Sequence, residues 1–181
     1  AELALPALTV AALAAIESLL AARVAASLAD TGPYDPDREL VGQGLASIAA
    51  WSAEAGLSNI AAPLHLDASA PDWPLGHADA LLCINMVHIS PWAATLGLFA
   101  GAARLLGPGA PLILYGPYIE AAVATADSNL AFDASLRSRN PAWGLREVEA
   151  VVDAAARHGF RFTERRTMPA NNLMLLFRKG G

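Results

Sequence analysis

Hydrogen-bonding side chains follow a short apolar run in the stretch LLCINMVHISPW, residues 81–92. The run has the composition of a buried strand, and Asn85, His88 and Ser90 come soon after it. An unperturbed histidine titrates near neutrality and can act as a general base, while an amide can position a reacting group. The alternative is that Asn85 and His88 cap the next helix and bond to loop carbonyls. We name both residues as candidate catalytic residues.

Two other predicted strands also end in polar residues. The stretch PLHLD ends at Asp67, and LILYGPY ends with Tyr115 and Tyr118, which are further catalytic candidates. Ligands of a parallel α/β sheet bind beyond the carboxyl ends of its strands. We therefore expect one cleft at that edge of the sheet, formed by Asp67, Asn85, His88, Tyr115 and Asn140.

A long polar connection, residues 116–143, is rich in groups that bind ligands, and a short helix is compatible with residues 129–139. An arginine and an amide beside an aromatic ring can hold a carboxylate or a phosphate. The alternative is an internal salt bridge between Asp133 and Arg137, four residues apart. The turn MPANN adds neighbouring amides, although asparagine often serves turn geometry alone. The predicted substrate-binding residues are Asn129, Arg139, Asn140, Trp143 and Asn171.

The pattern of apolar residues predicts the elements that must position these groups. Expected helices are 9–29, 40–55, 91–106 and 144–158, and expected strands are 59–67, 79–86, 110–115, 160–167 and 172–179. Strands that alternate with helices indicate a parallel sheet covered on both faces, with 79–86 beside 110–115. The last two strands are joined by MPAN alone, so they should pair antiparallel. The helices of the second half should bury Leu96, Phe99, Val148 and Val152.

Composition narrows the class of protein. The chain has 181 residues, 55% of them hydrophobic and 16% charged, with a net charge of -5. These values favour one folded domain and give no basic surface for nucleic acid. Cys83 is the only cysteine and sits in an apolar run, so we expect a small buried hydrophobe. The four histidines lack the spacing of a zinc site, so no metal is expected.

The alanine-rich beginning of the chain does not have the pattern of a membrane anchor. Glu17 and Arg23 interrupt the apolar stretch between Leu3 and Leu28, which leaves no segment long enough to span a bilayer. We expect a soluble cytoplasmic protein that uses a small-molecule substrate and binds neither membrane nor nucleic acid. The sequence does not set the oligomeric state.

Five segments together resemble a known family. They are APLHLD, LLCINMVHISPW, LILYGPY, SNLAFDASLRSRNPAWGLRE and MPANNLMLLFRK, and they extend from about Leu45 to Lys179. This part of the chain resembles an uncharacterised, methyltransferase-like family of predicted class I S-adenosylmethionine-dependent methyltransferases. The resemblance implies a Rossmann-like α/β three-layer sandwich, with a mainly parallel sheet and an antiparallel last strand.

The resemblance also implies a cofactor, S-adenosylmethionine, and a place for it. Asp67 lies where such folds contact the adenine, and Asn85 and Met86 lie at the strand end that borders donor and acceptor. Asp35 or Asp37 matches the acidic turn that binds the ribose hydroxyls. His88 would serve as the general base, with the acceptor positioned by Asn85, Tyr115 and Tyr118 and covered by Arg139, Asn140 and Trp143.

The first 44 residues depart from the family pattern. Such folds begin with a glycine-rich loop of the form E-x-(A/G)-x-G-x-G, and Thr31 and Gly32 are its nearest remnant here. Either this chain has lost the unit, or residues are missing or misassigned before Leu45. The first case predicts weak or undetectable S-adenosylmethionine binding, whereas the second predicts ordinary binding that is lost on Asp67→Ala. An alternative function is therefore a degenerate methyltransferase fold that acts as a non-catalytic binding or interaction protein.

Overall fold

The computed structural model describes residues 49–56, 58–62, 64 and 66–181. The chain divides into two compact units, Ala1–His65 and Leu66–Gly181. In the first unit, residues 49–54 are helical, in agreement with the helix expected over 40–55. The helix expected over 9–29 lies outside the described residues. The expectation of one domain for the whole chain stays a prediction.

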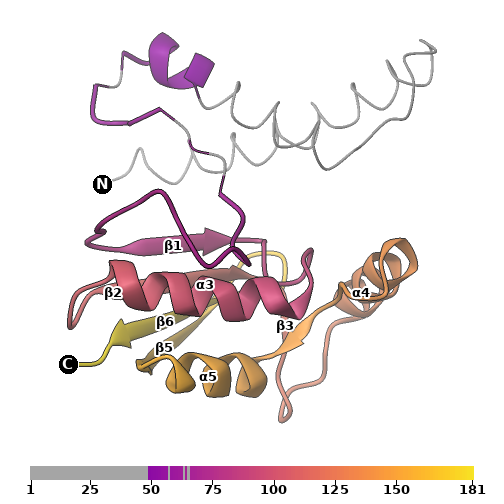
Figure 1. The fold of residues 1–181 in the computed structure, drawn as a ribbon. Helices are drawn as coiled ribbons and strands as arrows, with labels where there is room; N and C mark the ends of the chain where they lie inside the picture. Colours follow the sequence, from indigo (N-terminus) through magenta and orange to yellow (C-terminus); the bar gives the residue numbers. More distant parts are fainter. Residues whose placement is uncertain (1–48, 57, 63, 65) are drawn as a thin grey trace. The chain divides into compact units, whose positions relative to one another are not determined.

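The second unit is built on a four-stranded sheet (Figure 1). Its strands stand in the order β1 (Leu81–Ile84), β2 (Pro111–Gly116), β6 (Asn172–Lys179) and β5 (Phe160–Met168). β1 pairs parallel with β2, in the register Leu81 to Leu112, while β6 pairs antiparallel with both β2 and β5. The predicted neighbours and the antiparallel final pair are thus confirmed. A small second sheet pairs β3 (Tyr118–Ile119) parallel with β4 (Arg146–Glu147).

Two helices cover the face of the sheet that carries the alternating large residues of β2 and β6. α3 (Trp92–Leu105) and α5 (Val148–Arg157) belong with these strands to one hydrophobic core. Phe99 of α3 is fully buried among aromatic side chains, including Phe160 and Phe177. Val148 is also buried and Val152 partly buried, as expected. None of the helices within the described residues is long and apolar enough to cross a membrane.

The expected burial of Leu96 is wrong. Its side chain is exposed, whereas Thr95, Leu98, Phe99 and Ala102 form the buried stripe of α3. Successive helical residues turn by about 100° around the axis, so Leu96 falls beside this stripe and not within it. The apolar character of Leu96 therefore did not decide which face it occupies.

The strand expected over 59–67 is also wrong for the residues that the structure describes there. Those residues are not in a strand, and most of their side chains are exposed. At the end of the segment, the Asp67 carboxylate accepts hydrogen bonds from the backbone N–H and the hydroxyl of Ser69, at 2.8 and 2.7 Å. Ala70 N–H also donates to the Asp67 carbonyl. An aspartate that closes such a local turn diverts the backbone from ladder hydrogen bonds.

The connection over 116–143 is more regular than a long polar loop. It contains β3 and the helix α4 (Asp127–Arg139), which extends the short helix that the sequence suggested. Asp127 lies in the first turn of α4, and Arg137 and Arg139 lie in the last, which favours a helix through its dipole. The helix has little apolar surface to bury. The placement of its charges therefore accounts for a larger share of its stability.

Candidate functional site

The chain turns sharply where β1 ends. Asn85 has a positive φ of 58°, and its backbone N–H donates to the carbonyl of Tyr115, at 2.9 Å, which extends the pairing of β1 with β2. Asparagine tolerates this left-handed conformation better than most residues. The Ser90 hydroxyl then donates to the Met86 carbonyl, at 2.8 Å, and closes the turn before α3. This turn places the polar residues of LLCINMVHISPW beside the carboxyl end of β2.

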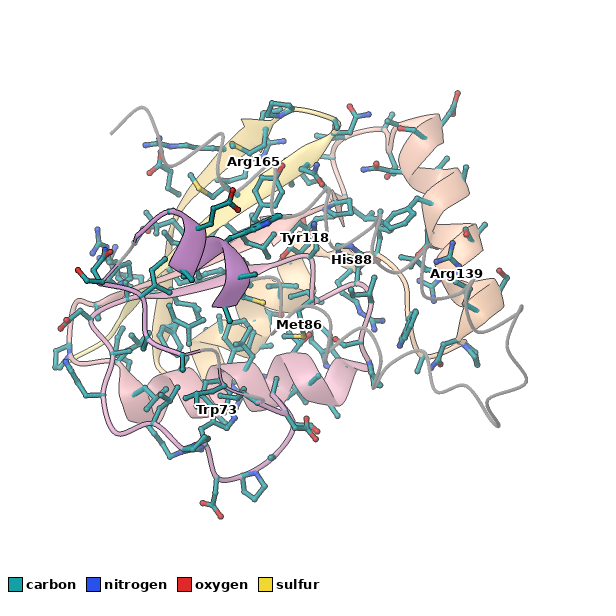
Figure 2. The ribbon with its side chains drawn as sticks, turned by 90° about the horizontal axis from the view of Figure 1, so that it is seen from above. Trp73, Met86, His88, Tyr118, Arg139 and Arg165 are labelled. Carbon is teal, nitrogen blue, oxygen red and sulfur yellow. The ribbon has the colours of Figure 1, made fainter. Side chains whose placement is uncertain are left out.

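Gly116 at the end of β2 makes room for two of these polar side chains. A Cβ atom at Gly116 would lie 3.1 Å from the imidazole Cε1 of His88 and 3.4 Å from Oδ1 of Asn85. The backbone of β2, Asn85 and His88 therefore meet at one point. Figure 2 shows Met86, His88 and Tyr118 gathered in this region, where the strands end.

His88 is enclosed where it lies. Its residue is 3% exposed, its ring lies edge-on to Phe132 of α4 with centroids 5.6 Å apart, and its Nδ1 lacks a hydrogen-bond partner in the described part of the chain. Burial, and then the nearby charge of Arg146, lower the pKa of His88 to about 4. The pKa is lowered from the near-neutral value of an unperturbed histidine because an imidazolium at this position would be desolvated. At neutral pH the ring is uncharged.

Arg146 connects the turn after β1 to the segment before β4 through hydrogen bonds. The sequence analysis did not single it out. Its guanidinium donates to the carbonyls of Ser90, at 2.9 Å, Ala142, at 2.7 Å, and Val87, at 3.4 Å. It also lies over the ring of Trp92, 5.8 Å from the centroid. One arginine thus binds the turn after β1 to the segment before β4. The sequence feature that could have identified Arg146 is its position in RNPAWGLRE, just before an amphipathic helix.

The polar residues at the end of α4 are engaged mostly with one another. Asp133 and Arg137 form the internal salt bridge considered as the alternative, at 2.8 Å. Asn140 accepts a hydrogen bond from Ala142 N–H at 2.9 Å, so its side chain closes a turn. Arg139 donates to Ser135 within α4, at 3.3 Å. In Figure 2, Arg139 lies well away from the labelled residues at the strand ends.

Not all the residues expected in one cleft meet there. Asn85 and His88 do meet the backbone of Tyr115, but the side chain of Tyr115 alternates to the face of β2 opposite Gly116. The Asp67 carboxylate accepts hydrogen bonds from Ser69, and the Asn140 side chain accepts one from Ala142 N–H, which are bonds of local turns. We expected the Tyr115 side chain to lie beside His88. It does not, because successive residues of a strand point to opposite faces. Thr31, Gly32, Asp35 and Asp37 lie outside the described residues.

A pocket of about 150 Å³ is lined in part by Leu173, the residue of β6 that pairs with Gly116. It is formed by β3, the start of α4, the end of β5 and the start of β6. Three residues that the sequence analysis named come together in its wall: Tyr118, Asn129 and Asn171. Asn129 of α4 donates to the Asn171 carbonyl at 3.1 Å, and Asn171 donates to the Ser128 hydroxyl at 3.2 Å. These bonds tie α4 to the turn between β5 and β6.

The turn itself is strained. Ala170 and Asn171 both have positive φ, at 57° and 56°, and with Asn85 they are the non-glycine residues of this kind in the described part of the chain. Such outliers persist only where the surrounding structure enforces them, and they cluster at functional sites. All three stand at the two places described above, the β1 end and the pocket.

The sequence analysis missed two further residues of the pocket, Glu120 and Arg165. Arg165 of β5 grips the carboxylate of Glu120 through two hydrogen bonds, at 2.9 and 2.5 Å, and donates to Thr167 at 2.7 Å. Hydrogen bonding to Glu120 raises the pKa of Arg165 above its usual value. The spacing of Arg165 and Thr167 does put both on one face of β5, but their partner is 45 residues away in the chain.

Comparisons with known proteins agree with this architecture. The model of the family described as "Protein of unknown function (DUF938)" matches residues 21–179. The mitomycin 7-O-methyltransferase MmcR is similar in structure, with a TM-score of 0.65 at 17% identity over 76% of this chain and 40% of that one. The apo form of the S-adenosylmethionine-dependent methyltransferase SibL gives 0.62 at 18% identity, over 77% and 41%. An O-methyltransferase family protein from Burkholderia thailandensis gives 0.57 at 14% identity, over 81% and 42%.

These likenesses establish the fold. The second unit has the mixed α/β sheet of class I methyltransferases, Rossmann-like and with an antiparallel last strand. The chain spans about two fifths of the length of these solved structures.

Proposed function

The chain belongs to the DUF938 family of proteins of unknown function, and we propose that it is an S-adenosylmethionine-dependent methyltransferase that acts on a small-molecule acceptor. One observation carries the proposal. Asn85 and His88 pack against Gly116 at the carboxyl ends of two parallel strands, in a fold shared with methyltransferases. This edge of an open α/β sheet is where such folds place their ligands.

The described residues fit one flank of the methyl donor. Asn85 offers an amide on a strained turn, and Met86 follows it half-buried. We propose that Asn85 and Met86 hold this flank. When bound, the donor would supply an electrophilic methyl group to the acceptor.

The residues of this chain would act mainly by positioning. Aligning donor and acceptor can supply most of the acceleration in such a transfer. The neutral imidazole of His88 can accept a hydrogen bond or a proton, but its pKa of about 4 makes it a weak base at neutral pH. We propose that Tyr118, Asn129 and Asn171, which line one pocket, hold the acceptor.

A second candidate function is supported by one specific observation. The first 44 residues contain no glycine-rich loop of the type that approaches the donor in class I folds. A chain that has lost this loop could keep the fold and bind a partner or a metabolite without catalysis. The strained, polar residues at the β1 end favour the enzyme over this second candidate.

Calorimetric titration with S-adenosylmethionine and S-adenosylhomocysteine distinguishes the two candidates. We expect saturable binding of both if the chain is a methyltransferase. Asn85→Ala should raise the Kd about tenfold, which is the usual effect of losing one well-placed hydrogen bond. Asn59→Ala, which removes the same amide from an exposed turn, is the matched control. A folded protein that gives no saturable heat with either ligand would favour the non-catalytic candidate.

A further inference from the structure

The hydroxyl of Tyr118 is an unmet hydrogen-bonding group beside the pocket. Tyr118 is 5% exposed and lines the pocket, and its hydroxyl is buried without a hydrogen-bond partner among the described residues. Burial raises the pKa of this phenol above its usual value, so the hydroxyl keeps its proton. A buried polar group without a partner costs about 1–3 kcal/mol. A ligand atom that bonds to it would recover that cost.

The charges of the pocket wall are already balanced. Among the described residues that line it, the charged ones are Glu120 and Arg165, and they form a two-bond ion pair with each other. A charged ligand would therefore have to break this pair or lose its hydration without a counter-charge, and both are costly. The wall thus favours an uncharged ligand.

The size and the lining of the pocket narrow the ligand further. A cavity of about 150 Å³ can hold one benzene ring. Val123 and Leu173 give the wall apolar surface, whereas Asn129 and Thr167 give it hydrogen-bonding groups. A single ring with one polar substituent matches this combination.

We propose that the pocket binds an uncharged, single-ring molecule through a hydroxyl group that hydrogen-bonds to Tyr118. This inference rests on the proposed function, since that hydroxyl oxygen would be the methyl acceptor. Its lone pair would bond to the methyl carbon, the carbon–sulfur bond of the donor would break with its electrons on sulfur, and the hydroxyl proton would pass to solvent. Tyr118 lies two residues after Gly116, so the pocket adjoins the β1 end where the donor is proposed to bind.

Phenol is the probe that tests this inference, in titrations followed by protein NMR without any methyl donor. We expect phenol to bind saturably and to shift the amide signals of residues 118–126 and 171–173. Benzoate and benzylammonium, which add a negative or a positive charge to the same ring, should bind at least about tenfold more weakly. Absence of phenol binding, or tighter binding of benzoate than of phenol, would overturn the inference.

Two variants test the contact with the hydroxyl. Tyr118→Phe should raise the Kd for phenol about tenfold and leave the Kd for toluene, which has no hydroxyl, unchanged. Tyr115→Phe removes the same atom from the face of β2 opposite Gly116 and should change neither value. Toluene binding to Tyr118→Phe also shows that the pocket is intact; equal loss of phenol and toluene affinity would contradict a specific hydroxyl contact. Because no donor is present, this result is independent of S-adenosylhomocysteine binding, which tests the proposed function.

Discussion

His88 shows how burial decides the chemistry of a single residue. Its ring packs against the backbone of Gly116 and the ring of Phe132. It is enclosed there, with little room for water around it. The sequence placed this residue and its neighbours Asn85 and Met86 around the end of a strand, and in the structure they follow β1, which ends at Ile84. It could not give the pKa, which depends on burial in the fold and on Arg146, a residue far along the chain.

The lowered pKa of His88 makes stability depend on pH. In the unfolded chain the ring binds a proton below about pH 6.5, whereas in the folded chain it does so only below about pH 4. The unfolded state therefore binds more protons between these values, and the free energy of unfolding should fall on acidification. The contribution is about 2 kcal/mol between pH 7 and pH 5. Urea unfolding at the two pH values should show that His88→Gln loses about 2 kcal/mol less than the wild type.

An exposed histidine provides the control for this experiment. His77 is largely exposed, and its imidazole pairs with the exposed Asp79. His77→Gln should therefore lose the same stability as the wild type between pH 7 and pH 5. If His88→Gln and the wild type lose equal stability, His88 does not hold an unprotonated ring in the folded state.

At the scale of elements, the helix α3 and the segment before β1 approach each other unusually closely. A Cβ atom at Gly97 would lie 2.2 Å from the carbonyl oxygen of Ala68, and one at Gly101 would lie 2.4 Å from the ring of Trp73. Arg104, one turn further, donates to the Pro71 carbonyl at 2.6 Å. The two glycines and the arginine thus form one strip of α3 on which the segment lies.

Gly97→Ala should destabilise the protein although alanine favours helices. In an open helical position the change would stabilise by about 1 kcal/mol. Here the new methyl group meets backbone atoms that cannot turn aside, and overpacking of this kind costs about 1–3 kcal/mol. Chemical unfolding measures the difference. Gly107→Ala, where nothing lies within 4 Å of the new atom, should change stability little, and equal effects of the two changes would show that the segment does not lie on α3.

The sequence predicted elements well where apolar periodicity was strong and poorly where local polar bonds decided. α3, α5, β2 and β6 were found near their expected positions, because each carries a buried face that the pattern records. The strand expected up to Asp67 failed because its carboxylate closes a turn with Ser69. α4 was only partly foreseen, since charged ends and not a hydrophobic stripe support it.

At the scale of the whole molecule, the topology was predictable and the pocket was not. The parallel pair of β1 and β2 and the antiparallel last strand follow from the alternation of elements and from the resemblance to class I methyltransferases. The wall of the pocket depends on contacts between distant parts of the chain. Arg165 pairs with Glu120, and α4 bonds to the turn after β5. A sequence pattern records the faces of single elements, and it does not record which faces later meet.

The measurement that tests the central claim most directly is the mapping of S-adenosylhomocysteine binding by amide chemical shifts of the labelled protein. If the carboxyl ends of β1 and β2 hold the methyl donor, the signals of residues 85–88 and 115–118 should move saturably. Those of the first half of β5, at the other end of the sheet, should stay in place. A folded protein in which no signals move, or in which the moving signals exclude residues 85–88, would contradict the assignment of this site to the donor.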